Sequence, residues 1–263
     1  MIYLARNLEE KMNTETKELI SKVPHVTLLF WIIKIFATTL GETGGDALSM
    51  SLDLGYLLST GIFALIFIAA VTVQIKATKF HPYLYWLTIV ATTTVGTTLA
   101  DYATRDMGIG YTGGSAILLT CVVISLLVWR WVMGTVSVES VSTAKAEVFY
   151  WVTIMFSQTL GTALGDWFAD SLDLGYLVAA AVFGTALLIT YLFYRFTSAS
   201  RVLLFWVAFI LTRPLGAVVG DFLDKPLDHG GLNLSRFTAS AVLLVLIVAF
   251  IYLFPQKPAE KSH

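Results

Sequence analysis

Four aspartates recur at matching places in this sequence, and each closes an apolar stretch. The stretches superpose without gaps as FWIIKIFATTLGETGGD, YWLTIVATTTVGTTLAD, YWVTIMFSQTLGTALGD and FWVAFILTRPLGAVVGD, which end at Asp46, Asp101, Asp166 and Asp221. Carboxylate oxygens are the ligands that hard cations such as Mg²⁺, Mn²⁺, Ca²⁺ or Na⁺ prefer. The four aspartates are therefore candidate ligands of a cation or metal ion.

A second polar row precedes each aspartate by four and eight residues. On a helix, residues four apart drift by only ~40° per step, so this row and its aspartate share one face. Polar groups in a membrane helix usually face the bundle interior or a water-filled cavity. The row predicts an outward-open polar cavity with these further ion-binding candidates: Glu42, Thr38, Thr93, Thr97, Gln158 and Thr162. The simpler alternative is that the threonines bond their own helix and the aspartates cap helix ends.

Two cations depart from the repeat pattern, and both are candidates for coupling or gating. Arg213 stands where the other repeats have Thr or Gln, and Glu42 at a similar depth is its expected partner. Lys34 lies twelve residues before Asp46, which is ~18 Å along a helix, and no partner for it is evident. The alternative for Lys34 is a side chain that extends to the headgroups.

Glycines and tryptophans complete the repeated pattern. Small residues four apart let membrane helices pack closely, and here they recur in register as Gly41, Gly45, Gly96, Gly161, Gly165, Gly216 and Gly220. A tryptophan stands ten residues before the first of these glycines in each repeat, and the four predict an inner aromatic layer: Trp31, Trp86, Trp151 and Trp206. Ordinary core packing or an interfacial aromatic belt is the alternative.

Composition places the chain in a membrane. It is 57% hydrophobic and 13% charged over 263 residues, whereas soluble domains carry about 25% charge. Eight apolar stretches of span length are present, at 24–46, 54–75, 82–103, 112–134, 147–168, 174–194, 201–222 and 236–254. The sequence thus predicts an all-α polytopic membrane protein with eight transmembrane helices, because a span in lipid must satisfy its backbone internally.

The repeats divide the chain into four two-helix units. The predicted boundaries are 24–78, 79–143, 144–198 and 199–255, between a surface helix at 1–23 and a tail at 256–263. Since two spans per repeat keep all repeats in one orientation, the units should be parallel, either pseudo-fourfold or two plus two. Twelve of the 17 Lys and Arg residues fall on the side of both termini. The positive-inside rule makes that side cytoplasmic.

With its four matching tryptophans and its spacing, the chain resembles a bacterial membrane-protein family of four tandem repeats, each with two transmembrane segments and a characteristic tryptophan. The resemblance covers about residues 24–255. The family is a repeat of unknown function, so it implies an architecture and a location in the bacterial cytoplasmic membrane, and no activity.

Signatures of other function classes are missing from the sequence. It contains no nucleotide-binding glycine motif, no HExxH and no basic patch for nucleic acid, and Cys121 is its single cysteine. We therefore expect no enzyme activity, no cofactor and no nucleic-acid partner. Three functions stay open: a transporter or channel for a hard cation, a carrier of a small organic solute held by Arg213, and a membrane scaffold or regulatory subunit. The partners are then the lipid bilayer and a small cation or solute, and a homo-oligomer also stays open.

Overall fold

The computed structural model describes residues 21–259, and all eight long elements in that part of the chain are α-helices. The first helices of the four repeats are α2 (Leu28–Asp46), α4 (Pro82–Asp101), α6 (Ala144–Asp166) and α8 (Arg201–Asp224). The second helices are α3 (Gly55–Lys76), α5 (Tyr111–Met133), α7 (Gly175–Phe196) and α9 (Arg236–Leu253). Residues 21–259 form no β-strand, which confirms the predicted all-α class. The predicted surface helix at 1–23 falls almost wholly outside the described residues.

Local sequence sets where the first helices begin. The hydroxyls of Thr27, Thr143 and Ser200 accept hydrogen bonds from backbone N–H groups in the first turns of α2, α6 and α8. These bonds satisfy donors that a helix start leaves without an intrahelical partner. Helix α4 instead begins with Pro82, whose missing N–H and fixed φ suit a first turn.

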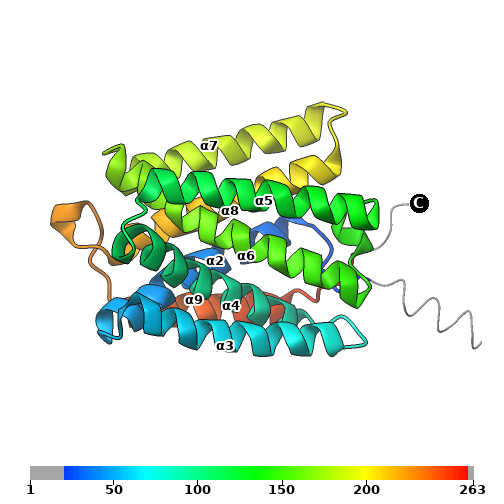
Figure 1. The fold of residues 1–263 in the computed structure, drawn as a ribbon, viewed down its shortest axis with the longest axis horizontal. Helices are drawn as coiled ribbons and strands as arrows, with labels where there is room; N and C mark the ends of the chain where they lie inside the picture. The colour runs from blue at the N-terminus through cyan, green and yellow to red at the C-terminus, as the bar shows by residue number, and fades with distance from the viewer. Residues whose placement is uncertain (1–20, 260–263) are drawn as a thin grey trace, which may run out of the picture.

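The four first helices form a closed ring. Helix α2 packs against α4 and α8, and α6 packs against the same two helices. Each second helix covers the first helix of the next repeat, and α9 returns to cover α2 (Figure 1). This order is the parallel, pseudo-fourfold arrangement. The ring has an acidic end, where Asp46, Asp101, Asp166 and Asp221 lie, and an aromatic end with Phe30, Tyr85, Tyr150 and Phe205.

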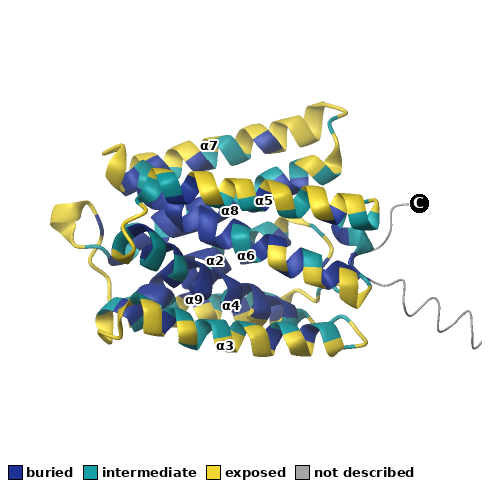
Figure 2. Cartoon of the chain, viewed as in Figure 1, coloured by how far each residue is buried: buried dark blue, intermediate teal, exposed yellow. Residues whose placement is uncertain are grey.

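Burial separates the two kinds of helix. Dark, buried residues run along the ring helices, whereas α3, α5 and α7 carry long exposed stretches (Figure 2). The exposed residues of these outer helices are largely Leu, Ile, Val and Phe. Five of the described helices, α3, α5, α7, α8 and α9, are long and apolar enough to cross a membrane. The other three, α2, α4 and α6, carry many of the polar residues that the ring buries. An apolar outside around a polar inside is typical of a membrane bundle.

The turns at the acidic end account for a heptapeptide, SLDLGYL, that occurs twice in the sequence, at Ser51–Leu57 and Ser171–Leu177. Asp53 and Asp173 are exposed and have φ of 55° and 53°, and Gly108 occupies the matching place in the second repeat with φ of 69°. Among residues with a side chain, Asp and Asn adopt this left-handed conformation most readily. The two aspartates are therefore turn residues just before the second helices, which begin at Gly55 and Gly175.

The two ends of the described chain meet at the aromatic end. The His25 backbone N–H donates to Lys257 O at 2.8 Å, and the Ala259 N–H donates to Val23 O at 2.8 Å. Nearby, Lys22 Nζ lies 2.6 Å from the buried Glu147 carboxylate. Since both chain ends lie on one side of the ring, the chain crosses from one end to the other an even number of times.

Candidate functional site

Glycines on each ring helix contact the polar row of the next helix. A Cβ added to Gly41 would overlap the side chain of Thr93. The same close approach recurs around the ring at these pairs: Gly96 with Gln158, Gly161 with Arg213, and Gly216 with Thr38. One layer nearer the acidic end, the pairs are Gly45 with Thr97, Gly165 with Ala217, and Gly220 with Glu42. The glycines thus pack helices, and they bring the polar rows together.

Residues at every fourth position of the ring helices form a central column of five buried layers. From the acidic end, the first two layers are Asp46, Asp101, Asp166 and Asp221, then Glu42, Thr97, Thr162 and Ala217. The third and fourth layers are Thr38, Thr93, Gln158 and Arg213, then Lys34, Ile89, Ile154 and Phe209. The fifth is Phe30, Tyr85, Tyr150 and Phe205. All twenty side chains belong to buried residues, so the column is the interior of the ring.

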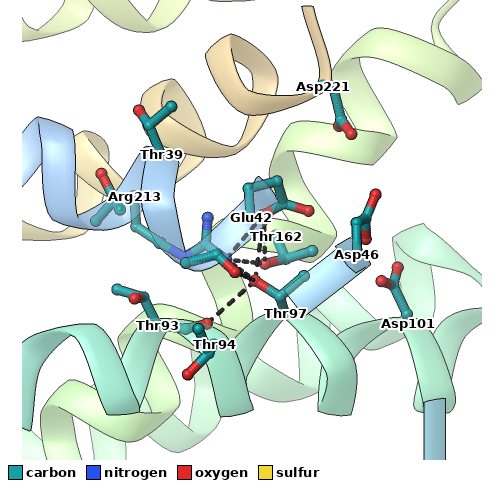
Figure 3. Close-up of polar contacts among 12 residues, drawn as sticks. Thr39, Glu42, Asp46, Thr93, Thr94, Thr97, Asp101, Thr162, Arg213 and Asp221 are labelled. Atoms are coloured by element: carbon teal, nitrogen blue, oxygen red, sulfur yellow. Dashed lines mark hydrogen bonds and ion pairs between the residues drawn. The ribbon is translucent and has the colours of Figure 1, made fainter. Parts of the chain in front are cut away.

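Arg213 lies at the centre of the ring because it contacts side chains from all three other ring helices. Its Nη2 donates to Glu42 Oε2 at 2.9 Å, to Thr97 Oγ1 at 2.6 Å and to Thr162 Oγ1 (Figure 3). The fourth repeat has Ala217 in that layer, and its small side chain leaves room for the guanidinium. The predicted pairing of Arg213 with Glu42 is confirmed.

Lys34 lies one layer below Arg213, among apolar side chains. Its Nζ is 3.4 Å from Thr212 Oγ1 and 4.0 Å from the centre of the Phe209 ring. These are weak contacts for a fully buried amino group, and no carboxylate in the described chain forms an ion pair with it. The side chain stays in the core instead of extending to the headgroups.

Replacing Lys34 with methionine is therefore expected to raise stability. The buried amine loses hydration without gaining an ion pair, and burying an unpaired polar group costs about 1–3 kcal/mol. Thermal unfolding in detergent measures the change, with Ile89→Met in the same layer as the matched control. A Lys34→Met protein less stable than the Ile89→Met protein would show that the ammonium stabilises the ring.

At the acidic end, the four aspartates lie as two pairs, each bridged by one basic residue. Arg105, in the turn η2 (Tyr102–Asp106) after α4, lies 3.2 Å from Asp101 and 3.0 Å from Asp166. Lys225, just after α8, lies 2.7 Å from Asp46 and 3.1 Å from Asp221. The backbone is thus pseudo-fourfold, whereas its charges follow a twofold pattern.

Lys225 is held as a cation by this environment. Burial by itself would lower its pKa, but the charges of Asp221, Asp46 and Asp224 outweigh burial and raise the pKa well above its usual range. Lys225 therefore stays protonated at neutral pH and neutralises part of the negative charge around it.

A metal ion has one candidate position in the described part of the chain. Asp46, Asp221 and Asp224 each offer an oxygen within 4.8 Å of the others, and all three are buried. Asp101 and Asp166, also predicted as metal ligands, belong to no such group of three among residues 21–259. Both carboxylates form ion pairs with Arg105 instead.

The aromatic end is closed by side chains of the fifth layer. The hydroxyls of Tyr85 and Tyr150 lie 2.6 Å apart, and the rings of Phe30 and Phe205 are 6.2 Å apart between centres. The four predicted tryptophans follow these residues by one position and surround them: Trp86 donates to Gln256, and Trp206 donates to Val136 O. The predicted aromatic layer exists, and its centre is formed by the residue before each tryptophan.

The structure differs from the predicted open cavity. Glu42 and the four aspartates of the first layer are at most 3% exposed. The reason is that Arg213 fills the middle of the second layer, while Arg105, Lys225 and Arg236 cover the acids. Thr38, Thr93 and Thr97 also hydrogen-bond backbone carbonyls of the neighbouring ring helix. The predicted residues come together as a packed column.

Sequence reasoning missed the basic residues at the acidic end. Arg105 and Lys225 each stand four residues after a repeat aspartate, where the other repeats have Met50 and Asp170. A comparison of the repeats beyond the aspartate would have found this alternation. Tyr56 and Tyr111, the tyrosines of the repeated turn, were also missed, and their hydroxyls accept hydrogen bonds from Arg105 at 3.1 and 3.0 Å.

The ring, its apolar covering and its buried charges define a polytopic α-helical membrane protein built from four two-helix repeats. A family model described as Repeat of Unknown Function (DUF347) matches four times, at residues 29–80, 84–135, 149–200 and 204–257. The chain belongs to this family. No curated protein and no solved structure matches it.

Proposed function

We propose that this protein is a carrier that moves a hard inorganic cation across the bacterial cytoplasmic membrane. The observation that supports it is the set of buried carboxylates inside the ring: Glu42, Asp46, Asp101, Asp166, Asp221 and Asp224. Acids buried among membrane helices are costly and commonly mark ion or proton pathways. Six of them around one axis exceed what helix capping requires, and their oxygen ligands suit hard cations.

A carrier fits this ring better than an open channel. Arg105, Lys225 and Arg236 cover the acidic end, and the Tyr85–Tyr150 pair closes the aromatic end. Between them, the positive charge of Arg213 opposes free passage of a cation. A carrier does not need a continuous pathway, because it exposes its ion site to one side at a time.

The twofold charge pattern supports a division of the ring into two halves. Arg105 joins the α4 side to α6, and Lys225 joins α8 to α2. At the other end, Tyr85 bonds Tyr150, again linking α4 to α6. The ring can therefore open between α2 and α4 and between α6 and α8 without breaking either bridge. One half is then α2 with α8, and the other is α4 with α6. Arg213 holds the halves together, since its bonds to Thr97 and Thr162 cross from the first half to the second.

The distribution of charge supports a cytoplasmic aromatic end with both termini there. Lys76, Lys79, Lys145 and Arg195 lie near the loops or helix ends of that side. Basic residues in short loops are retained on the cytoplasmic side. The acidic end then faces outward, where negative charge concentrates cations.

Transport by the purified protein in lipid vesicles tests the proposal. Vesicles containing the protein are expected to take up Mn²⁺, Mg²⁺, Ca²⁺ or Na⁺ faster than empty vesicles. Asp46→Asn is expected to reduce this uptake by about tenfold or more, because it removes a charged oxygen ligand of the cation.

Asp53→Asn is the matched control. It removes an exposed carboxylate at the same end, and Asn tolerates the left-handed backbone there. Unchanged uptake is expected. If both variants lost uptake equally, the acids would act only through the general negative charge of this surface. The proposal would be overturned if the vesicles took up none of these cations. Uptake of a small carboxylate that is lost in Arg213→Lys would favour an organic-solute carrier instead.

A further inference from the structure

At the acidic end, one half of the ring brings three carboxylates together. Asp46, Asp221 and Asp224 place one oxygen each within 4.8 Å of one another. Two basic residues form ion pairs with these acids: Lys225 lies 2.7 Å from Asp46, and Arg236 lies 2.9 Å from Asp224. Three acids against two bases leave one negative charge beside the membrane interior. Such a charge is costly unless something compensates it.

One carboxylate oxygen of these three acids has no hydrogen-bond partner. Asp224 Oδ1 is buried and accepts no hydrogen bond, and the Asp224 side chain is fully buried. Its other oxygen, Oδ2, is the one that Arg236 contacts. A buried carboxylate oxygen is normally paired. Asp224 Oδ1 is thus a free acceptor within a group of three acids.

A surface pocket leads to this group. It has a volume of about 410 Å³ and is lined by residues that include Ser51, Asp224, Asn233 and Arg236. Arg236 stands between the pocket and the acids, because its Nη1 donates to the exposed Ser51 at 3.2 Å while its Nε faces Asp224. Its side chain is 20% exposed. An ion in the pocket would therefore meet Asp224 once Arg236 moves aside.

The opposite half of the ring also has one acid more than it has bases, since Asp101 and Asp166 share Arg105, but among the described residues it has no third acid in reach of them. There Thr104 occupies the place of Asp224, three residues after the repeat aspartate, and its hydroxyl bonds the Ala100 carbonyl of its own helix. The bridging cation is Arg105, which is also held by two tyrosine hydroxyls. Arginine stays charged and makes several directed bonds, whereas lysine is a flexible point charge. Arg105 is therefore a fixed bridge, and Lys225 is an exchangeable one. Arg236 makes fewer bonds than Arg105, one to Asp224 and one to the exposed Ser51.

We propose that Asp46, Asp221 and Asp224 bind one divalent hard cation, and that Lys225 and Arg236 are tethered counter-ions that the cation displaces. The ion enters through the pocket beside Ser51 and Arg236. Three carboxylates suit a divalent ion better than a monovalent one, since two charges neutralise more of the group, and their oxygens select Mg²⁺, Mn²⁺ or Ca²⁺. This inference deepens the proposed carrier function by naming its ion site, and it rests on that function for its purpose.

Equilibrium binding of Mn²⁺ to the full chain in detergent tests the site. One Mn²⁺ per chain is expected to bind. Asp224→Asn is expected to weaken binding by about tenfold or more, because it removes one of three charged ligands. Lys225→Met is expected to strengthen binding by about tenfold, because it removes the competing positive charge next to Asp46 and Asp221. A residue that only supported the fold would not improve binding when removed.

Two controls accompany these variants. Asp228→Asn removes an exposed acid in the same loop and is expected to leave binding unchanged. Arg105→Met removes the bridge of the other half and is expected not to strengthen binding. Thermal unfolding of each variant without Mn²⁺ shows whether it is folded. Weaker or unchanged binding in folded Lys225→Met, or equal losses in Asp224→Asn and Asp228→Asn, would overturn the site.

The site and the carrier function can fail separately. If the protein binds one Mn²⁺ that is lost in Asp224→Asn, but vesicles take up no cation, the site stands and the carrier falls. If vesicles take up cations while Asp224→Asn leaves both uptake and Mn²⁺ binding intact, the carrier stands and the site falls.

Discussion

Arg213→Met is expected to destabilise the protein by about 3–5 kcal/mol, the cost of leaving one member of a buried ion pair without its partner. Arg213 is fully buried, and its guanidinium reaches Glu42, Thr97 and Thr162 on three other helices. Without it, the Glu42 carboxylate remains inside the ring with two threonine hydroxyls as its contacts. Thermal or denaturant unfolding in detergent measures the loss.

The double variant Glu42→Gln with Arg213→Met separates charge from packing. It removes both charges and keeps side chains of similar size. Most of the lost stability is expected to return, because replacing both members of a buried ion pair is often close to neutral. If the double variant were as unstable as Arg213→Met alone, the stabilising role would belong to the shape of the arginine and not to its pairing with Glu42.

Gly161→Ala is expected to separate α6 from α8 and to cost about 1–3 kcal/mol, the usual effect of adding a methyl group to a packed core. The new Cβ would overlap Arg213 Cβ and Cγ, and it would also approach the backbone nitrogen of Pro214. Arg213 cannot shift without disturbing its contact with Glu42. The substitution therefore affects packing and the central ion pair together, and thermal unfolding should show a clear decrease.

Gly184→Ala on α7 is the control for this substitution. No atom lies within 4 Å of a Cβ placed at Gly184. Because Gly in a helix interior is less favourable than Ala by roughly 0.5–1 kcal/mol, this change is expected to be neutral or slightly stabilising. Equal effects of Gly161→Ala and Gly184→Ala would mean that close approach at Gly161 does not hold the ring together.

Much of the fold can be predicted from the sequence because the physical constraints are local. A membrane span must be a helix, so eight apolar stretches predict eight helices. Two spans per repeat imply parallel units whatever the contacts. The glycines at Gly41, Gly96, Gly161 and Gly216 mark the packing surfaces, since only a residue without a side chain permits so close an approach.

Part of the site can also be predicted from the sequence, because the sequence gives the depth of each residue in the membrane. A position along a helix converts directly into height in the membrane. Glu42 and Arg213 lie at similar heights, which predicts their pairing, and the pair is present at 2.9 Å. The sequence offers no acid at the depth of Lys34, and the structure places apolar Ile89, Ile154 and Phe209 in its layer.

The height of a residue does not specify its neighbours around the ring axis, so the sequence does not predict which side chains meet there. Four aspartates at one height predict a single ring of ligands, yet they form two bridged pairs. The bridging cations, Arg105 and Lys225, lie beyond the spans in turns whose direction no periodicity predicts. The open cavity fails for a related reason: whether polar side chains line a space or fill it depends on the distance between helices.

The sequence by itself determined the class of the protein, its repeats, the faces of its helices and the depth of each charge. These follow from the cost of exposing a polar group to lipid, which acts on each helix separately. Only the tertiary structure decided that Arg213 lies on the axis and that Lys225 bridges Asp46 and Asp221. It also decided that Asp224 joins them under a surface pocket. Those relations depend on the order of the helices around the ring, because side chains from several repeats meet only when the ring closes.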